Sequence, residues 1–124
     1  MIEFDKQILS LKRKQMIKDN IIKISLEDYD KIQSKQRNGI YEVENAGTFY
    51  YVNGKFHRED GPACEYANGN KYWIFNDKYH RLDGPAIEWN DGEKYYYIEG
   101  KKYDTKEESD KVSYMYKNGL MDYL

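Results

Sequence analysis

The sequence predicts a mainly β fold (α+β): an antiparallel β-meander of hairpin repeats with N-terminal helices and a short C-terminal helix. Three observations support this prediction. Residues 50–72 and 73–95 align without a gap and are identical at 12 of 23 positions, a tandem period that indicates a repeat architecture. Turn-forming residues separate short aromatic segments in both units, as in consecutive hairpins. Apolar residues recur at helical spacing near both ends of the chain.

The chain of 124 residues is long enough for one domain. We expect three segments within it: an N-terminal helical segment over residues 1–39, a repeat sheet with its C-terminal helix over residues 40–117, and a tail over residues 118–124. The single cysteine, Cys64, excludes an internal disulfide and suits a reducing compartment. It aligns with Ile87 of the next unit, which predicts a packed thiol.

The formal net charge of -2 is unevenly distributed. Residues 1–40 carry 9 Lys/Arg and 6 Asp/Glu, whereas residues 41–124 carry 11 and 16, which gives +3 and -5. Neither part resembles a strongly basic nucleic-acid-binding domain or a densely acidic nucleic-acid mimic. No apolar run approaches the roughly 20 residues of a membrane span, and the N-terminus lacks a signal peptide's apolar centre. We therefore expect a cytoplasmic protein, in the host cytoplasm if a virus encodes it, with no membrane association.

Residues 4–18 show the apolar spacing of a helix, with Phe4, Ile8 and Leu11 on one stripe. Basic side chains lie beside this stripe at Lys12, Arg13, Lys14 and Lys18. Such a helix can bind an anionic surface, but a short one more often covers a core with its basic side in solvent. We favour the second role.

The segment Ile21–Ile24 is β-branched and short, which predicts a strand. Ser25 followed by Asp28 resembles a capping box and predicts a second helix over about residues 26–36. An Asn-Gly pair then ends this helix, because both residues tolerate the left-handed backbone of a helix end.

Short strands are expected at residues 41–43, 48–52, 73–75, 78–81, 86–89, 93–98 and 101–103. Two-residue turns join some of them at Asn53-Gly54, Asn76-Asp77 and Glu99-Gly100. Asn and Gly accept the positive φ that such turns need, and Asp77 is a tolerable departure from Gly. After the last strand, Thr105 with Glu108 forms a capping box that predicts a helix over about 106–116.

The motif His-Arg-x-Asp-Gly-Pro-Ala occurs at residues 57–63 and again at 80–86, spaced by a hairpin of the Trp/Tyr-x-x-Asn-Gly type. This pattern resembles a MORN-like repeat variant, which occurs in bacterial, phage and large-virus proteins of mostly unassigned function. The resemblance covers about residues 40–117 and implies a single-layer antiparallel meander. Some MORN proteins bind acidic lipids, but the net negative charge of this repeat region disfavours lipid binding.

The repeated His, Arg and Asp residues have the chemistry of a catalytic site but lack its arrangement. A catalytic site needs different residues that converge on one point, whereas residues repeated every 23 positions form parallel stripes. We expect a structural ladder in which His and Arg bond Asp and turn carbonyls, formed by His57, Arg58, Asp60, Gly61, Pro62, His80, Arg81, Asp83, Gly84 and Pro85. No metal-site spacing, nucleophile motif or phosphate-binding loop is recognisable, so we expect no enzyme activity, metal or cofactor.

The central strands have apolar side chains on both faces. Tyr72 and Ile74 are expected to point to one face, and Trp73 and Phe75 to the other. A sheet with one face in water would instead alternate apolar with polar residues. We therefore expect the N-terminal helices, another subunit or a partner protein to cover the second face. The predicted partner-binding residues are Tyr51, Tyr72, Trp73, Trp89, Tyr95, Tyr96, Tyr97, Lys12 and Arg13.

These observations favour a non-enzymatic protein–protein interaction module. The resemblance to phage and virus proteins suggests a specific version, an inhibitor of a host defence protein such as an anti-CRISPR protein, which rests on analogy alone. Two alternatives stay open: a small-ligand-binding or enzymatic domain that uses the His/Arg/Asp stripe, and a nucleic-acid-binding accessory protein that uses Lys12, Arg13 and Lys14. A protein partner is expected, a homodimer is an open alternative, and nucleic acid is not expected as a direct ligand.

Overall fold

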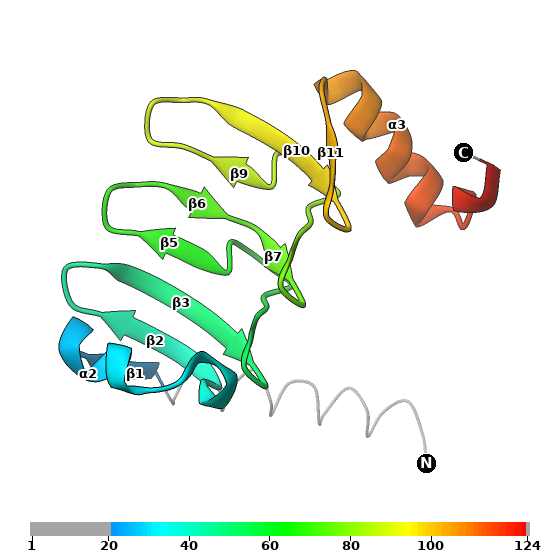
Figure 1. Cartoon of the computed structure of the whole chain (residues 1–124). Helices are drawn as coiled ribbons and strands as arrows, with labels where there is room; N and C mark the ends of the chain where they lie inside the picture. The colour runs from blue at the N-terminus through cyan, green and yellow to red at the C-terminus, as the bar shows by residue number, and fades with distance from the viewer. Residues whose placement is uncertain (1–20, 124) are drawn as a thin grey trace, which may run out of the picture.

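The computed structural model describes residues 21–123 of the chain. The helix predicted over residues 4–18, with Lys12 and Arg13, lies outside these residues. The described part is mainly β, with a nine-stranded sheet, a separate two-stranded sheet and a helix, α3, near the C-terminal end (Figure 1). Adjacent strands pair antiparallel, except for β1 and β2, which are parallel.

The strands of the large sheet follow one another in space as β1 (Ile21–Ile24), β2 (Gly39–Val43), β3 (Gly47–Val52), β5 (Cys64–Tyr66), β6 (Lys71–Tyr72), β9 (Ile87–Glu88), β10 (Lys94–Ile98) and β11 (Lys101–Tyr103). Beside this series lie β4 (Lys55–Phe56), which pairs with β3, and the two-stranded sheet of β7 (Ile74–Phe75) and β8 (Lys78–Tyr79). The helical elements are α2 (Leu26–Lys31), α3 (Lys106–Lys117) and the 3-10 helices η1 (Ser34–Gln36) and η2 (Met121–Tyr123).

The hairpins form two rows. The longer hairpins β2–β3, β5–β6 and β9–β10 lie side by side and build the large sheet, while the tighter turns after β3, β7 and β10 form a second row along one end (Figure 1). Each tight turn has two consecutive residues at positive φ: Asn53 and Gly54 (50° and 82°), Asn76 and Asp77 (49° and 64°), and Glu99 and Gly100 (47° and 83°). The three predicted two-residue turns are therefore confirmed.

The two sequence units make corresponding backbone contacts. The amide of Tyr50 donates to the carbonyl of Ala63 at 2.8 Å, and the amide of Trp73 donates to that of Ala86 at 2.7 Å. Trp73 lies between β6 and β7 and belongs to neither strand. The strand expected over residues 73–75 therefore begins one residue later, at Ile74.

The elements that precede the repeat sheet differ from the predicted ones. The strand Ile21–Ile24 is present, but it pairs parallel with β2, because the chain crosses over through α2 and η1 before it enters β2. The amide of Asp28 donates to the Ser25 hydroxyl at 3.1 Å, as expected of a cap. The helix ends at Lys31, short of the predicted residue 36, because Ile32 adopts extended backbone angles (φ -84°, ψ 118°).

The C-terminal helix agrees with the prediction. It spans Lys106–Lys117, and the amide of Glu108 donates to the hydroxyl of Thr105 at 3.1 Å. Its buried residues are Ser109, Val112 and Ser113, and it contacts β10 and β11. Within residues 21–123, no helix is long and apolar enough to span a bilayer.

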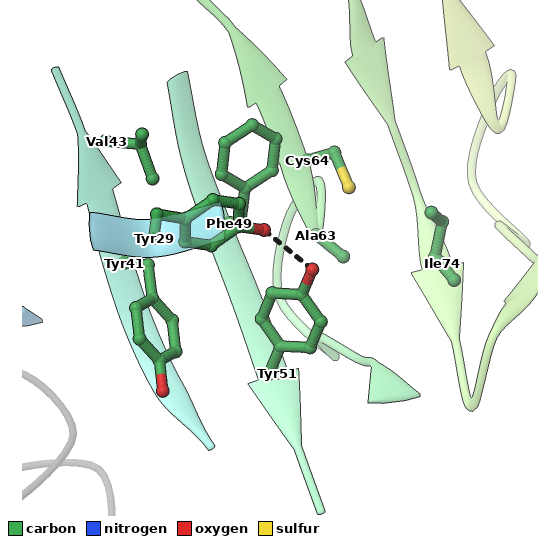
Figure 2. Packing of buried hydrophobic residues seen from close by; sticks show 8 residues of the cluster. All are labelled: Tyr29, Tyr41, Val43, Phe49, Tyr51, Ala63, Cys64 and Ile74. Carbon is green, nitrogen blue, oxygen red and sulfur yellow. Dashed lines mark hydrogen bonds between the residues drawn. The ribbon is translucent and has the colours of Figure 1, made fainter. Parts of the chain in front are cut away.

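The hydrophobic core lies on one face of the sheet, under α2. Tyr29 of α2 stacks on Phe49 with ring centroids 5.6 Å apart, and its hydroxyl lies 2.7 Å from that of Tyr51 (Figure 2). The buried members of the core are Tyr29, Tyr41, Val43, Phe49, Tyr51, Ala63, Cys64 and Ile74. Burial raises the pKa of the Cys64 thiol to about 12, so this cysteine is a protonated, packed side chain near neutral pH.

Candidate functional site

The core face of the sheet continues past α2 as a surface of aromatic rings. Strand pairing places Cys64 opposite Tyr72, Tyr72 opposite Ile87, and Ile87 opposite Tyr95. Paired residues share one face of a sheet, and side chains two positions apart on a strand do so as well. We call this surface the aromatic face and define it by Tyr66, Tyr72, Tyr79, Trp89, Tyr95 and Tyr97.

The rings of the aromatic face form a nearly continuous series. Successive ring centroids are 5.5 Å apart for Tyr66 and Tyr72, 6.0 Å for Tyr72 and Tyr79, and 5.2 Å for Tyr79 and Tyr97. Trp89 and Tyr95 form a second pair at 4.9 Å. These distances and the tilted or edge-on orientations are those of favourable aromatic pairs. The rings therefore support one another through these contacts.

Exposure separates the aromatic face from the core that it extends. Tyr66, Tyr79 and Trp89 are 42%, 37% and 39% exposed, whereas Tyr41 and Phe49 under α2 are 4% and 5% exposed. No element within residues 21–123 covers these three rings as α2 covers the core. A surface of this composition resembles the centre of a protein interface, where Tyr and Trp are enriched.

The hydroxyl groups of Tyr66, Tyr79 and Tyr95 have raised pKa values, so they are hydrogen-bond donors near neutral pH. Burial is the main cause that raises the pKa of Tyr66 and of Tyr79 above the ordinary value. The pKa of Tyr95 is raised chiefly because its hydroxyl donates a hydrogen bond to the carboxylate of Glu93. The face thus offers apolar area together with neutral polar groups.

On the opposite face of the sheet, the repeated arginines lie over aromatic rings. The guanidinium of Arg58 lies 4.1 Å from the ring centroid of Tyr50, and that of Arg81 lies 3.9 Å from that of Trp73. Arg58 also pairs with Glu65 at 3.6 Å. The repeated arginines thus cover these two rings, while the predicted cover by a helix over residues 4–18, a second subunit or a partner stays a prediction.

Three of the predicted partner-binding residues lie away from the aromatic face. Tyr51 is 4% exposed, so its side chain belongs to the core and is not available to a partner. Trp73 lies under Arg81. Tyr96 is flanked along β10 by Tyr95 and Tyr97 and therefore points to the opposite face. The other four described members, Tyr72, Trp89, Tyr95 and Tyr97, lie together on the aromatic face.

The arginine of each repeated motif stabilises the Gly-Pro corner of the same motif. Nη1 of Arg58 donates to the carbonyl of Pro62 at 3.1 Å, and Nη1 of Arg81 donates to that of Pro85 at 3.0 Å. A Cβ atom at Gly61 would lie 2.6 Å from the guanidinium carbon of Arg58. The second unit repeats this arrangement, with 3.0 Å between the same atoms of Gly84 and Arg81. The motif therefore has glycine where the arginine folds back over the corner.

The two histidines accept hydrogen bonds from the next tight turn. Nδ1 of His57 accepts from the amide of Asn76 at 3.1 Å, and Nδ1 of His80 accepts from the amide of Glu99 at 2.9 Å. The ring of Phe75 lies between them, 4.2 Å from His57 and 5.9 Å from His80. The histidines thus bond backbone amides, whereas bonds to Asp and turn carbonyls were expected.

The aspartates of the motif form ion pairs. Nε of Arg58 lies 3.0 Å from Asp60, and Nζ of Lys117 lies 2.7 Å from Asp83. The second pair connects α3 to the corner of the second unit. Hydrogen bonding to Lys117 is the main cause that lowers the pKa of Asp83.

No metal cluster marks another site in the described part of the chain. Residues 21–123 contain no group of three or more His, Cys, Asp and Glu side chains placed to hold a metal ion. A shallow, open depression lies between β1 and the β2–β3 turn, with Lys23, Glu42 and Glu44 in its lining. Its mixed charges and open shape give it no definite ligand chemistry.

Two members of the aromatic face, Tyr66 and Tyr79, were missed by the sequence reasoning. Tyr66 occupies the position of Trp89 in the preceding unit, so the repeat itself held the signal for this residue. The position of Tyr79 depends on the tight turn of β7 and β8, which brings its ring between Tyr72 and Tyr97.

No family model, curated protein or solved structure matches this chain.

Proposed function

We propose that this chain is a non-enzymatic protein-binding module whose contact surface is the aromatic face. The observation that supports this proposal is the row of partly exposed rings from Tyr66 to Tyr97, which extends the core beyond α2. Exposed apolar patches of this kind are uncommon on isolated domains and are typical of interaction sites. The MORN-like repeat predicted from the sequence would serve as the scaffold that presents them.

The contacts of the histidines and arginines disfavour the enzymatic alternative. In both units, Nδ1 of the histidine already accepts a backbone amide, and the arginine is engaged with a ring and a proline carbonyl. The two histidines also lie in different sequence units, and Phe75 contacts both of them. A general base needs a free lone pair within reach of its substrate.

A narrower version of the proposal is an inhibitor of a host defence protein, such as an anti-CRISPR protein, acting in the host cytoplasm. Its support is the resemblance of the repeated motif to proteins of phages and large viruses. In this version, the aromatic face and the predicted helix with Lys12 and Arg13 would both contact the target.

The proposal is tested by affinity purification from the natural host with the intact chain and with face variants. Trp89→Ala and Tyr79→Ala should lose a specific protein partner, because large side chains at the centre of an interface contribute most to binding. Tyr114→Ala is the matched control, since Tyr114 is 63% exposed and lies on α3. A partner retained equally by all three variants would show that the aromatic face is not the contact surface.

A further inference from the structure

Three aromatic rings of this chain each have an arginine guanidinium packed over them. Arg37 lies 3.8 Å from the ring centroid of Tyr29, and Arg58 and Arg81 lie at 4.1 Å and 3.9 Å from Tyr50 and Trp73. A planar guanidinium gains both electrostatic attraction and stacking from an aromatic ring. These are the three arginines of residues 21–123, so each of them is already paired with a ring of this chain.

The aromatic face has rings of the same kind without an arginine. Among the described residues, the cation recorded over this face is Lys102, whose Nζ lies 5.1 Å from the ring centroid of Tyr95. Lysine stacks less well than arginine because its ammonium group is compact and strongly hydrated. The rings of Trp89 and Tyr95 therefore offer a surface for a planar cation that the described chain does not itself supply.

The charge around this pair favours a cationic ligand. Residues 21–123 carry 15 Lys/Arg and 19 Asp/Glu, a net charge of -4. Glu93 accepts the Tyr95 hydroxyl hydrogen bond, and Asp91 also acts electrostatically on that hydroxyl. Two carboxylates thus lie beside the rings, where they attract cations and repel phosphate groups.

We propose that the aromatic face binds a basic, arginine-bearing segment of a partner protein, with a guanidinium stacked on Trp89 and Tyr95 beside Asp91 and Glu93. This inference rests on the proposed protein-binding function and specifies the chemistry of the partner. The net negative charge disfavours nucleic acid as the occupant, since its phosphates would add repulsion.

The test uses the full chain and three blocked peptides that are identical except at three positions in a Gly/Ser background: arginine, its neutral isostere citrulline, or lysine. Binding is followed by NMR at the two tryptophan indole N–H groups. The arginine peptide should shift the signal of Trp89 and leave that of Trp73, which Arg81 already covers, unchanged. Citrulline should bind about tenfold more weakly, because the charge is lost while shape and hydrogen-bonding groups are largely kept.

Variants of the chain test whether the arginine peptide binds at Trp89 and Tyr95. Trp89→Ala, followed at the backbone amide of Tyr95 because the indole reporter is lost, should abolish the binding, and Asp91→Asn with Glu93→Gln should weaken it several-fold. Lys102→Ala should strengthen it, because the competing internal cation is removed. Tyr114→Ala on α3 should bind like the original chain.

Four results would overturn the inference. Equal binding of the citrulline peptide would remove the role of charge, and equal binding of the lysine peptide would indicate general electrostatic attraction. Equal shifts at Trp73 and Trp89 would place the contact elsewhere. A shift of Trp89 that depends on protein concentration without peptide would identify a second copy as the occupant.

The inference and the proposed function can fail separately. A natural partner could lose affinity for the Trp89→Ala variant and yet contact the face through an uncharged segment. That result would support the proposed function and refute the binding of an arginine-bearing segment. An arginine peptide that binds Trp89 while the natural partner ignores face variants would refute the proposed function and keep the chemistry of the surface.

Discussion

The two sequence units, residues 50–72 and 73–95, have the same internal contacts but different surroundings. Both have an arginine over a ring, a histidine that accepts the amide of the next turn, and a Gly-Pro corner. On the core side, however, Tyr29 of α2 packs on Phe49, immediately before the first unit, whereas nothing among residues 21–123 packs over Trp89 of the second. The scaffold is therefore common to both units, and the difference between them lies in what covers it. The surface that we propose for binding lies beyond α2, begins within the first unit at Tyr66 and includes Trp89 of the second.

The largest effect is expected where the cover itself is removed. Tyr29→Ala deletes the stacking on Phe49, the bond between its hydroxyl and that of Tyr51, and the ring under Arg37. We expect a loss of about 3–5 kcal/mol in the free energy of unfolding, as for other buried aromatic residues. Urea unfolding followed by circular dichroism measures it.

Tyr29→Phe is the matched control, because it keeps the ring and removes only the hydroxyl, at a cost of about 1 kcal/mol. A Tyr29→Ala loss as small as that of Tyr29→Phe would mean that α2 is not the cover that distinguishes the two units.

Substitution of the glycine in each Gly-Pro corner compares the two units on the opposite face of the sheet. An alanine Cβ would lie 2.6 Å from the Arg58 guanidinium carbon at position 61, but 3.0 Å from that of Arg81 at position 84. We expect Gly61→Ala to cost about 1–3 kcal/mol in unfolding free energy, and Gly84→Ala to cost less, since crowding must push the arginine off its ring. Thermal melts of the two variants show which of them loses more stability.

A double-mutant cycle identifies the cause of this loss. Arg58→Ala combined with Gly61→Ala should cost less than the sum of the single changes, because the clash disappears with the arginine. Strict additivity would show that the corner needs glycine for another reason.

Local features of the fold were predictable from the sequence because neighbouring residues decide them. Asn53-Gly54 adopts positive φ whatever surrounds it, and Thr105 caps α3 through an amide only three residues away. The parallel pairing of β1 depends on β2, and Ile32, where α2 ends, packs against a core that β2 and β3 help to form. Periodicity could not reveal them.

The candidate site was predictable only in part, for the same reason. Strand alternation separated Tyr72 from Trp73, but only the strand pairing of the structure places Tyr95 and Tyr97 on the face of Tyr72. The burial of Tyr51 depends on Tyr29, which lies 22 residues before it, and the cover of Trp73 depends on how Arg81 folds back. Both are tertiary contacts between long side chains, for which the sequence pattern holds no signal.

A smaller effect is expected from the histidine of the second unit. Burial is the main cause that lowers the pKa of His80 below 6.5, while Glu99 opposes the shift. The unfolded chain therefore takes up a proton at a higher pH than the folded chain does. The contribution of neutral His80 to stability is complete above about pH 6.5 and is lost as the pH falls through the folded pKa.

His80→Asn isolates this contribution, because an amide oxygen can accept the Glu99 amide hydrogen bond without titrating. The difference in unfolding free energy between about pH 7.5 and pH 5 should be smaller in the variant than in the original chain. An identical pH dependence would mean that groups other than His80 account for it.

The smallest effect on stability is expected at the centre of the aromatic face. Trp89 is 39% exposed, and its recorded ring contact is with Tyr95 alone among the described residues. Trp89→Ala should therefore change the unfolding free energy by about 1 kcal/mol or less, although tryptophan is larger than the tyrosine at position 29. Urea unfolding in parallel with Tyr29→Ala checks this. A loss at Trp89 equal to that at Tyr29 would mean that the second unit is covered as firmly as the first, and its rings would then be core, not a binding surface.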